Sequence, residues 1–135
     1  MKYVIIVVLV AMQITVVAQT TSSLQDDSVY TEIEKMPEFK GGREAMYKTI
    51  NQNIYYPPIA RRAEVQGTSW VSFIVEKDGT ISDVKIQESL SKETDEEAMR
   101  VVSLLTTWIP GEVNGQPVRV RTALPIKYKL LGKKR

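Results

Sequence analysis

Alternating apolar and polar positions between Gly67 and Gln87 predict a β-hairpin. Val71, Phe73 and Val75 recur at every second residue, which is the spacing of a strand with one buried face. Asp78-Gly79 follows, and this pair favours the positive φ angles that tight turns require. Because an isolated hairpin is only marginally stable in water, we expect the flanking segments to add strands and a helical cover.

The second strand of this hairpin begins out of step. Val84 and Ile86 point inward and Lys85 points outward by the same alternation, whereas Ile81 is displaced from this pattern by one residue. An extra residue in one strand of a pair forms a β-bulge. We therefore expect a bulge just after the turn.

The segment from Val118 to Leu130 has the longest alternation in the chain. Every even-numbered position is apolar or threonine, and the odd-numbered positions between them carry arginine, alanine, proline or lysine. This pattern predicts one long strand with an apolar face and a basic face.

Helical spacing replaces the alternation between Arg43 and Ile54. Met46, Ile50 and Ile54 recur at every fourth position, with Tyr47 beside them. Such positions share one side of a helix, so a short amphipathic helix is expected here. We interpret its methionine and tyrosine as packing residues.

A second, shorter helix is expected to begin at Pro58. Proline suits the first helical position, because its missing N–H would have had no partner there. The run Tyr55-Tyr56-Pro57-Pro58 ends the first helix, since a residue before proline is displaced from the α region. We expect Ile59, Ala60 and Ala63 to point inward.

A third helix is predicted near Thr94. Thr94, with Glu97 three residues later, has the form of a capping box, in which each side chain bonds the backbone of the other residue. The segment Trp108–Gly111 ends the helix. Between these signals lies an apolar stripe that is expected to pack on the sheet, formed by Ala98, Val101, Val102 and Leu105.

The N-terminal segment has the pattern of an export signal. Lys2 precedes an apolar run from Tyr3 to Met12, and the exit Val16-Val17-Ala18 follows shortly after it, so we expect cleavage after Ala18 and function in the periplasm. A retained membrane anchor is the alternative. Residues 19–38 form a polar lead with a short edge strand expected within Val29–Glu34. The main domain is expected over 39–131, followed by a basic tail at 132–135.

The composition narrows the class of function. The chain has 18 basic and 16 acidic residues, and its formal net charge of +2 is too small to indicate a nucleic-acid binder. It has no histidine and no cysteine, which excludes disulfides, thiolate or imidazole metal sites and catalysts of these two types. We therefore expect no enzyme, no metal or other cofactor, and no small-molecule substrate.

Several of these features follow one another in an order typical of one family. The motifs are YYPPIARRAEVQG, KDGTISDVKI, a helix ending in W-x-PG, and PVRVRTALPIKYKL. Together they resemble the C-terminal domain of TonB, the energy transducer that couples inner-membrane proton motive force to outer-membrane transporters. The resemblance covers roughly residues 39–130. It implies an α+β fold, an antiparallel sheet of three or four strands with two main helices packed on one face.

The resemblance also implies how a partner binds. In the family, the TonB box, a short peptide of the outer-membrane transporter, lies along the last strand near a Tyr-Pro segment and is held by strand addition. A packing role for Tyr56, and a role of the prolines in helix entry, are the alternatives. Carried over by position, the candidate partner-binding residues are Tyr56, Pro57, Pro58, Arg61, Arg119, Val120, Arg121, Thr122 and Ala123.

Pro125 indicates which side of the last strand is open. Backbone groups of successive strand residues face alternate sides, and proline has no N–H to give to a neighbouring strand. We therefore expect the odd-numbered backbones, including those of Arg119, Arg121 and Ala123, to face an open edge. The two arginine side chains would also favour an acidic partner segment.

The chain departs from full-length transducers in its N-terminal part. Only about 20 residues separate Ala18 from Phe39, a span of at most ~70 Å, so no long linker is present between them. We expect an exported protein-binding module that takes part in TonB-dependent transport. Self-association through the last strand, which gives a homodimer, is the alternative.

Overall fold

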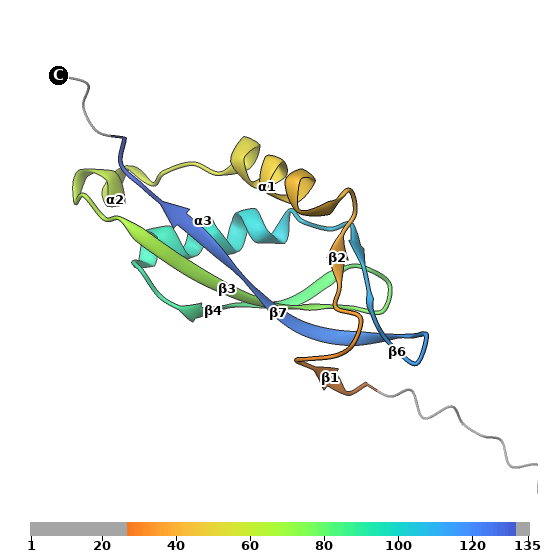
Figure 1. Ribbon diagram of the computed structural model, residues 1–135. Coiled ribbons are helices and arrows are strands. Elements are labelled where there is room, and N and C mark those ends of the chain that lie inside the picture. Colours follow the sequence, from red (N-terminus) through yellow and green to blue (C-terminus); the bar gives the residue numbers. More distant parts are fainter. Residues whose placement is uncertain (1–26, 132–135) are drawn as a thin grey trace, which may run out of the picture.

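The hairpin and the last strand form the centre of the structure, a computed structural model that describes residues 27–131 (Figure 1). β3 (Gly67–Val75) pairs antiparallel with β4 (Ile81–Glu88) on one side and with β7 (Gln116–Tyr128) on the other. The register between β3 and β7 has no shift between the first pair, Gly67 opposite Tyr128, and the last pair, Val75 opposite Val120. The hairpin and the long final strand are therefore confirmed.

Two short strands extend the sheet along β7. β6 (Gly111–Val113) pairs with the beginning of β7 through the turn Asn114-Gly115. β1 (Val29–Tyr30) lies parallel to β7 beside Arg119 and Val120. The expected edge strand in the lead is thus present, although it ends sooner than Glu34.

A strand that the sequence patterns did not predict lies just before the first helix. β2 (Glu38–Phe39) pairs antiparallel with β5 (Trp108–Ile109) in a separate two-stranded sheet. The rings of Phe39 and Trp108 meet edge to face, with their centroids 5.5 Å apart. Two residues are too few to show an alternation, so only their partner reveals this strand.

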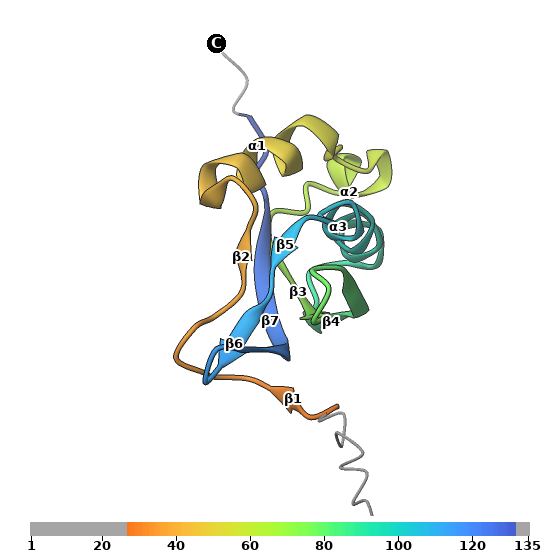
Figure 2. The same cartoon turned by 90° about the vertical axis from the view of Figure 1, so that its right-hand side faces the viewer.

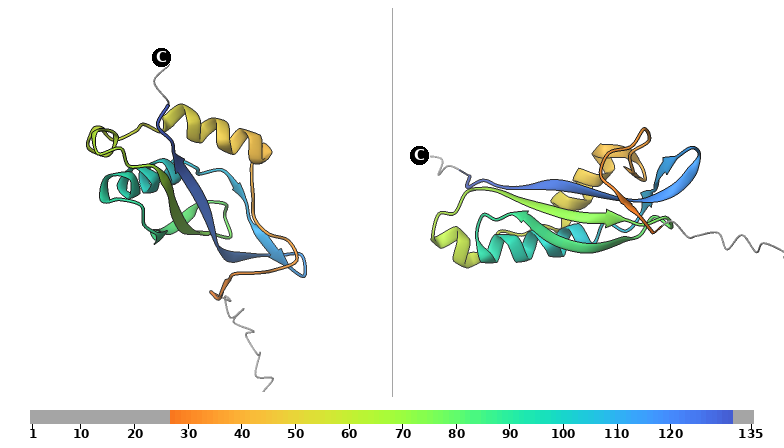
Figure 3. Two further views of the ribbon diagram at one scale, coloured as in Figure 1. Left: turned by 60° about the vertical axis from the view of Figure 1, so that its left-hand side comes forward. Right: turned by 90° about the horizontal axis from the view of Figure 1, so that it is seen from below.

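Three helices cover one face of the central sheet: α1 (Gly42–Asn53), α2 (Pro58–Arg62) and α3 (Lys92–Ser103). Figure 2 shows α2 and α3 together on one side of the sheet, and Figure 3 shows α1 beside the C-terminal end of β7. This arrangement confirms the α+β class. One buried cluster joins α1, α3 and the sheet and includes Met46, Ile50, Val71, Phe73, Val75, Val101, Val102, Leu105 and Ile126.

The predicted bulge lies just after the hairpin turn. Ile74 is opposite Ser82, and Ser72 is opposite Lys85, so β4 advances by one residue more than β3. Asp83 lies in this interval with φ 47°. The bulge restores the alternation, and Val84 and Ile86 pack against the core as expected.

The cap of α3 differs from the predicted one. Ser91 is the N-cap, and its hydroxyl accepts the N–H of Thr94 at 3.2 Å, while the hydroxyl of Thr94 accepts the N–H of Ser91 at 3.1 Å. The prediction of Thr94 as the cap and of Glu97 as its partner was wrong. Glu97 is instead buried. Its carboxylate accepts a hydrogen bond from the N–H of Tyr55 and forms a salt bridge with Arg100, and the bond to Tyr55 joins α3 to the segment after α1.

Asp95 fastens the beginning of α3 to the sheet. Its carboxylate accepts hydrogen bonds from Ser69 of β3, from Ser89 and from the N–H of Leu90. Burial pushes the pKa of Asp95 upward, but these hydrogen bonds outweigh burial and hold it below its usual value. Asp95, like Glu97, therefore has a structural role.

The prediction for α2 was correct at one position and wrong at two. Ala60 is buried, but Ile59 is 62% exposed and Ala63 is also exposed. α2 contains only five residues and ends at Arg62. A helix this short presents one side chain to the core, so the apolar pattern overestimated its buried side.

The hairpin turn is fixed by a contact with β5. The N–H of Trp108 donates to the carbonyl of Gly79 at 3.1 Å. Gly79 has φ 84°, and a Cβ atom there would lie 2.3 Å from the carbonyl oxygen of Trp108. The glycine is therefore required both for the turn and for the close approach of the second backbone.

Replacing Gly79 with alanine is expected to lower the free energy of unfolding by more than about 2 kcal/mol, because the backbone strain of a positive φ and the backbone contact add. Gly115→Ala is the matched control, since Gly115 has φ 76° but nothing within 4 Å of an added Cβ. That variant should lose only the strain, about 1–2 kcal/mol. Chemical denaturation measures both, and equal losses would contradict the role of the Trp108 contact.

Candidate functional site

The edge of β7 that faces away from β3 is open over most of its length. β1 covers this edge only beside Arg119 and Val120. Within residues 27–131, no other strand joins β7 between Arg121 and Lys127. An unpaired edge presents backbone donors and acceptors to a further strand.

Pro125 fixes the direction of these backbone groups. It lies opposite Trp70 in a register that is regular from Val120 to Tyr128, so no bulge changes the alternation along this stretch. The nitrogen of a proline in a strand belongs on the side without a ladder partner. The N–H groups of Arg121, Ala123 and Lys127 therefore face the open edge, as expected from the sequence.

Arg119 and Arg121 are engaged within the molecule. Arg119 donates through Nε to Glu76 at 2.8 Å and through Nη1 to the carbonyl of Asp27 at 2.9 Å. The hydrogen bond from Arg119 lowers the pKa of the Glu76 carboxyl below its usual value. Arg121 donates to Ser72 at 2.8 Å and pairs with Asp83. Both guanidinium groups thus neutralise neighbouring acids of the same sheet.

Tyr56 packs at the opposite end of β7. Its ring meets Tyr128 edge to face at 5.5 Å, its hydroxyl donates to the carbonyl of Val65, and Arg61 lies over the ring at 5.3 Å. Pro57 is buried beside it, whereas Pro58 is exposed. These contacts agree with the packing role of Tyr56 that the sequence left open.

The structure does not bring the candidate residues into one contact set. Tyr56, Pro57 and Arg61 lie near Tyr128, whereas Arg119 lies beside β1 near the other end of the strand. Extended backbone rises about 3.3 Å per residue, so the two groups are roughly 25–30 Å apart along β7. Between them lies the open part of β7, where Ala123 has an outward N–H group. The N–H groups of Val120 and Thr122 face β3, so these two predicted residues do not offer donors to the open edge.

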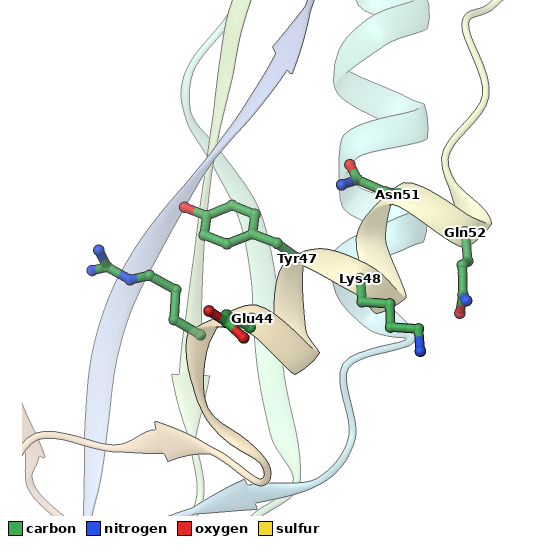
Figure 4. A pocket seen from close by; sticks show the side chains of 6 residues that line it. Glu44, Tyr47, Lys48, Asn51 and Gln52 are labelled. Atoms are coloured by element: carbon green, nitrogen blue, oxygen red, sulfur yellow. The ribbon is translucent and has the colours of Figure 1, made fainter.

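Sequence reasoning missed the part of α1 that flanks this edge. Tyr47 and Asn51 line a hollow of about 260 Å³ together with Pro125 and Lys127. Tyr47 was interpreted as a packing residue, but it is 39% exposed, and Figure 4 shows its ring pointing from α1 toward β7. Its position beside the apolar stripe rather than within it was the available signal.

The comparisons with known proteins agree on one family. The family model of the C-terminal domain of Gram-negative bacterial TonB proteins matches residues 52–130. No curated protein matches the chain at a significant level.

The fold is similar to solution structures of the TonB C-terminal domain of Helicobacter pylori. For a longer fragment, the sequence identity is 22% and the TM-score 0.51, with 65% of this chain and 79% of that chain covered. For a shorter fragment, the values are 21% and 0.50, with 64% and 90% covered. At this identity the likeness shows the fold.

Domains of this type face the periplasm and interact with outer-membrane transporters in TonB-dependent transport. None of the helices within residues 27–131 has the length and apolarity that a membrane crossing needs. The expected export signal lies outside the described residues.

By the match over residues 52–130 and the fold, the chain belongs to the family of TonB C-terminal domains.

Proposed function

We propose that the protein is a periplasmic binding module that docks the TonB box of an outer-membrane transporter by strand addition to β7. The supporting observation is the open edge between Arg121 and Lys127, which offers three outward N–H groups in a regular register. Main-chain hydrogen bonds to such an edge supply affinity in strand addition.

The chain already pairs one of its own strands with this edge. Val29 and Tyr30 form a parallel pairing with Arg119 and Val120, immediately before the open part. A partner strand would continue the edge that β1 begins. This continuity supports β7 as the docking strand, in preference to β4 on the opposite side of the sheet.

We also propose that the module is exported and acts by binding alone. The apolar run from Tyr3 to Met12 and the exit at Ala18 support export, with Gln19 as the first residue after cleavage. The sequence contains no histidine or cysteine, and residues 27–131 contain no group of side chains suited to hold a metal ion. Both observations favour a binding function over catalysis.

Titration of the isotopically labelled protein with peptides from the N-terminal segments of the bacterium's own TonB-dependent transporters tests the proposal. Amide exchange at Arg121, Ala123 and Lys127 is expected to slow about tenfold on binding, because these N–H groups gain acceptors. Thr122 and Leu124 serve as internal controls, since their N–H groups already face β3. Protection confined to other strands would contradict the proposal.

Self-association through the same edge is the second candidate function. Two copies of an open strand can pair with each other in the way a partner peptide would. Sedimentation over a range of protein concentrations separates the two candidates. A dimer whose β7 amides are protected without peptide, and which gives no response to any peptide, would favour the structural role.

A further inference from the structure

One side of α1 faces the open edge of β7 and forms a second wall beside it. Arg43, Tyr47 and Asn51 follow one another at intervals of four residues, so they form a row along one face of the helix. Tyr47 and Asn51 line the same hollow as Pro125, Ile126 and Lys127. A strand added to the C-terminal part of β7 would therefore lie between β7 and α1.

The floor of this hollow is apolar. Ile50 and Ile126 are buried in it, and Ile54 is partly buried beside them. Its volume of about 260 Å³ is below the ~300–1,000 Å³ of typical small-molecule pockets. The size and the apolar floor fit one apolar side chain of an extended peptide.

The rim of the hollow carries positive charge. Lys127 is exposed on β7, and Arg43 lines the adjoining hollow together with Tyr47. Among residues 27–131, neither Arg43 nor Lys127 takes part in an ion pair, in contrast to Arg119 and Arg121. Glu44 is the one acid lining these two hollows. Their unpaired cations are complementary to an acidic side chain.

The polar groups of the second wall suit an extended backbone. Tyr47 presents a ring for packing and a hydroxyl for hydrogen bonding, and Figure 4 shows the amide of Asn51 on the same side of α1 as that ring. Lys48 and Gln52 point away from β7 in this view. Pro125 has no N–H to offer at this point of the edge, so a strand docked here gains fewer bonds from β7. Contacts with α1 would compensate for that loss.

We infer that Tyr47, Asn51 and Lys127 select the peptide bound at the edge of β7, favouring an extended segment in which an acidic residue adjoins an apolar one. The inference rests on the proposed docking at β7. It assigns recognition to the groove between α1 and β7, and it removes that role from Arg119 and Arg121, whose charges are already paired.

Two synthetic peptides of alternating valine and threonine test the inference, one ending in two aspartates and the other in two lysines. At low salt, the aspartate peptide is expected to bind about tenfold more tightly than the lysine peptide, and the preference should shrink as salt screens the charges. K127E should abolish or reverse the preference. Lys85→Glu is the matched charge control on β4, with β3 between it and β7, and should retain the preference.

Removal of the aromatic wall provides the second measurement. Tyr47→Ala is expected to weaken both peptides about tenfold, because aromatic anchors dominate small interfaces. Tyr47→Phe should retain most of the affinity, because it keeps the ring that packs against the peptide. Ile59→Ala should not weaken binding, since this side chain on α2 is 62% exposed. Melting curves of the variants check that each remains folded.

The outcomes separate the two proposals. If peptide binding protects the β7 amides but neither Tyr47→Ala nor K127E changes affinity or preference, the groove inference is wrong, whereas docking at β7 is supported. If neither peptide affects the β7 amides, and the transporter peptides also leave them unprotected, strand addition at this edge is wrong and the groove inference falls with it.

Discussion

Replacing Phe73 with alanine is expected to lower the free energy of unfolding by about 3–5 kcal/mol. The Phe73 side chain is fully buried on β3, and its ring lies 5.4 Å from that of Trp108. It faces α3, where Val102 is also fully buried. The substitution removes both the transfer free energy of the ring and the contacts of the cavity lining.

A loss of this size is comparable to the total stability of a small domain, so the variant should be largely unfolded or only marginally folded. Circular dichroism during thermal and urea unfolding measures the effect. Ile59→Ala is the control, because it removes an apolar side chain of similar class that is 62% exposed, and it should change stability by less than about 0.5 kcal/mol. Similar losses in the two variants would show that burial does not distinguish them.

Proline at Ala123 is expected to abolish peptide binding while the domain remains folded. The N–H of Ala123 faces the open edge, its side chain is a methyl group without polar atoms, and Pro125 already occupies the same side of the strand two residues later. The substitution removes the central edge donor and leaves the pairing with β3 intact. Arg121→Pro would also remove an outward N–H, but it would remove the ion pair with Asp83 as well, so it is the less specific change.

Thr122→Pro is the matched counterpart on the ladder side. Thr122 lies opposite Phe73, and loss of its N–H leaves an acceptor of β3 unpaired at a cost of about 1–3 kcal/mol, in addition to distortion of the strand. Val120→Pro should behave in the same way, as it lies opposite Val75. Calorimetric titration and melting curves are measured for all variants. If Ala123→Pro unfolds the domain while Thr122→Pro does not, the open edge carries the even-numbered residues and the docking geometry is reversed.

The alternation of side chains was sufficient to predict the regular strands. Val71, Phe73 and Val75 fell on the buried face, and the shift at Ile81 predicted a bulge that lies beside Asp83. Pro125 even indicated the free side of β7, because the lack of an N–H is a property of the residue itself. These features depend on near neighbours or on covalent structure, which the sequence contains.

Other features depended on partners remote in the chain. β2 exists because Phe39 meets Trp108, and no local pattern marks it. Ser91 rather than Thr94 caps α3, and either residue could serve by type. The role of Glu97 is set by the Tyr55 backbone, 42 residues away. Short-range patterns do not specify such pairings.

The candidate site shows the same division. The order of the sequence motifs was sufficient to identify the family by resemblance, and that resemblance indicated the last strand as the docking strand. Pro125 by itself indicated the parity of the backbone, because proline chemistry is a local property. Only the tertiary structure showed that Arg119 and Arg121 are paired with Glu76 and Asp83, and that α1 brings Tyr47 beside Pro125. Charge pairing and the walls of a groove depend on which surfaces meet in the folded chain, and that is decided by the packing of the whole domain.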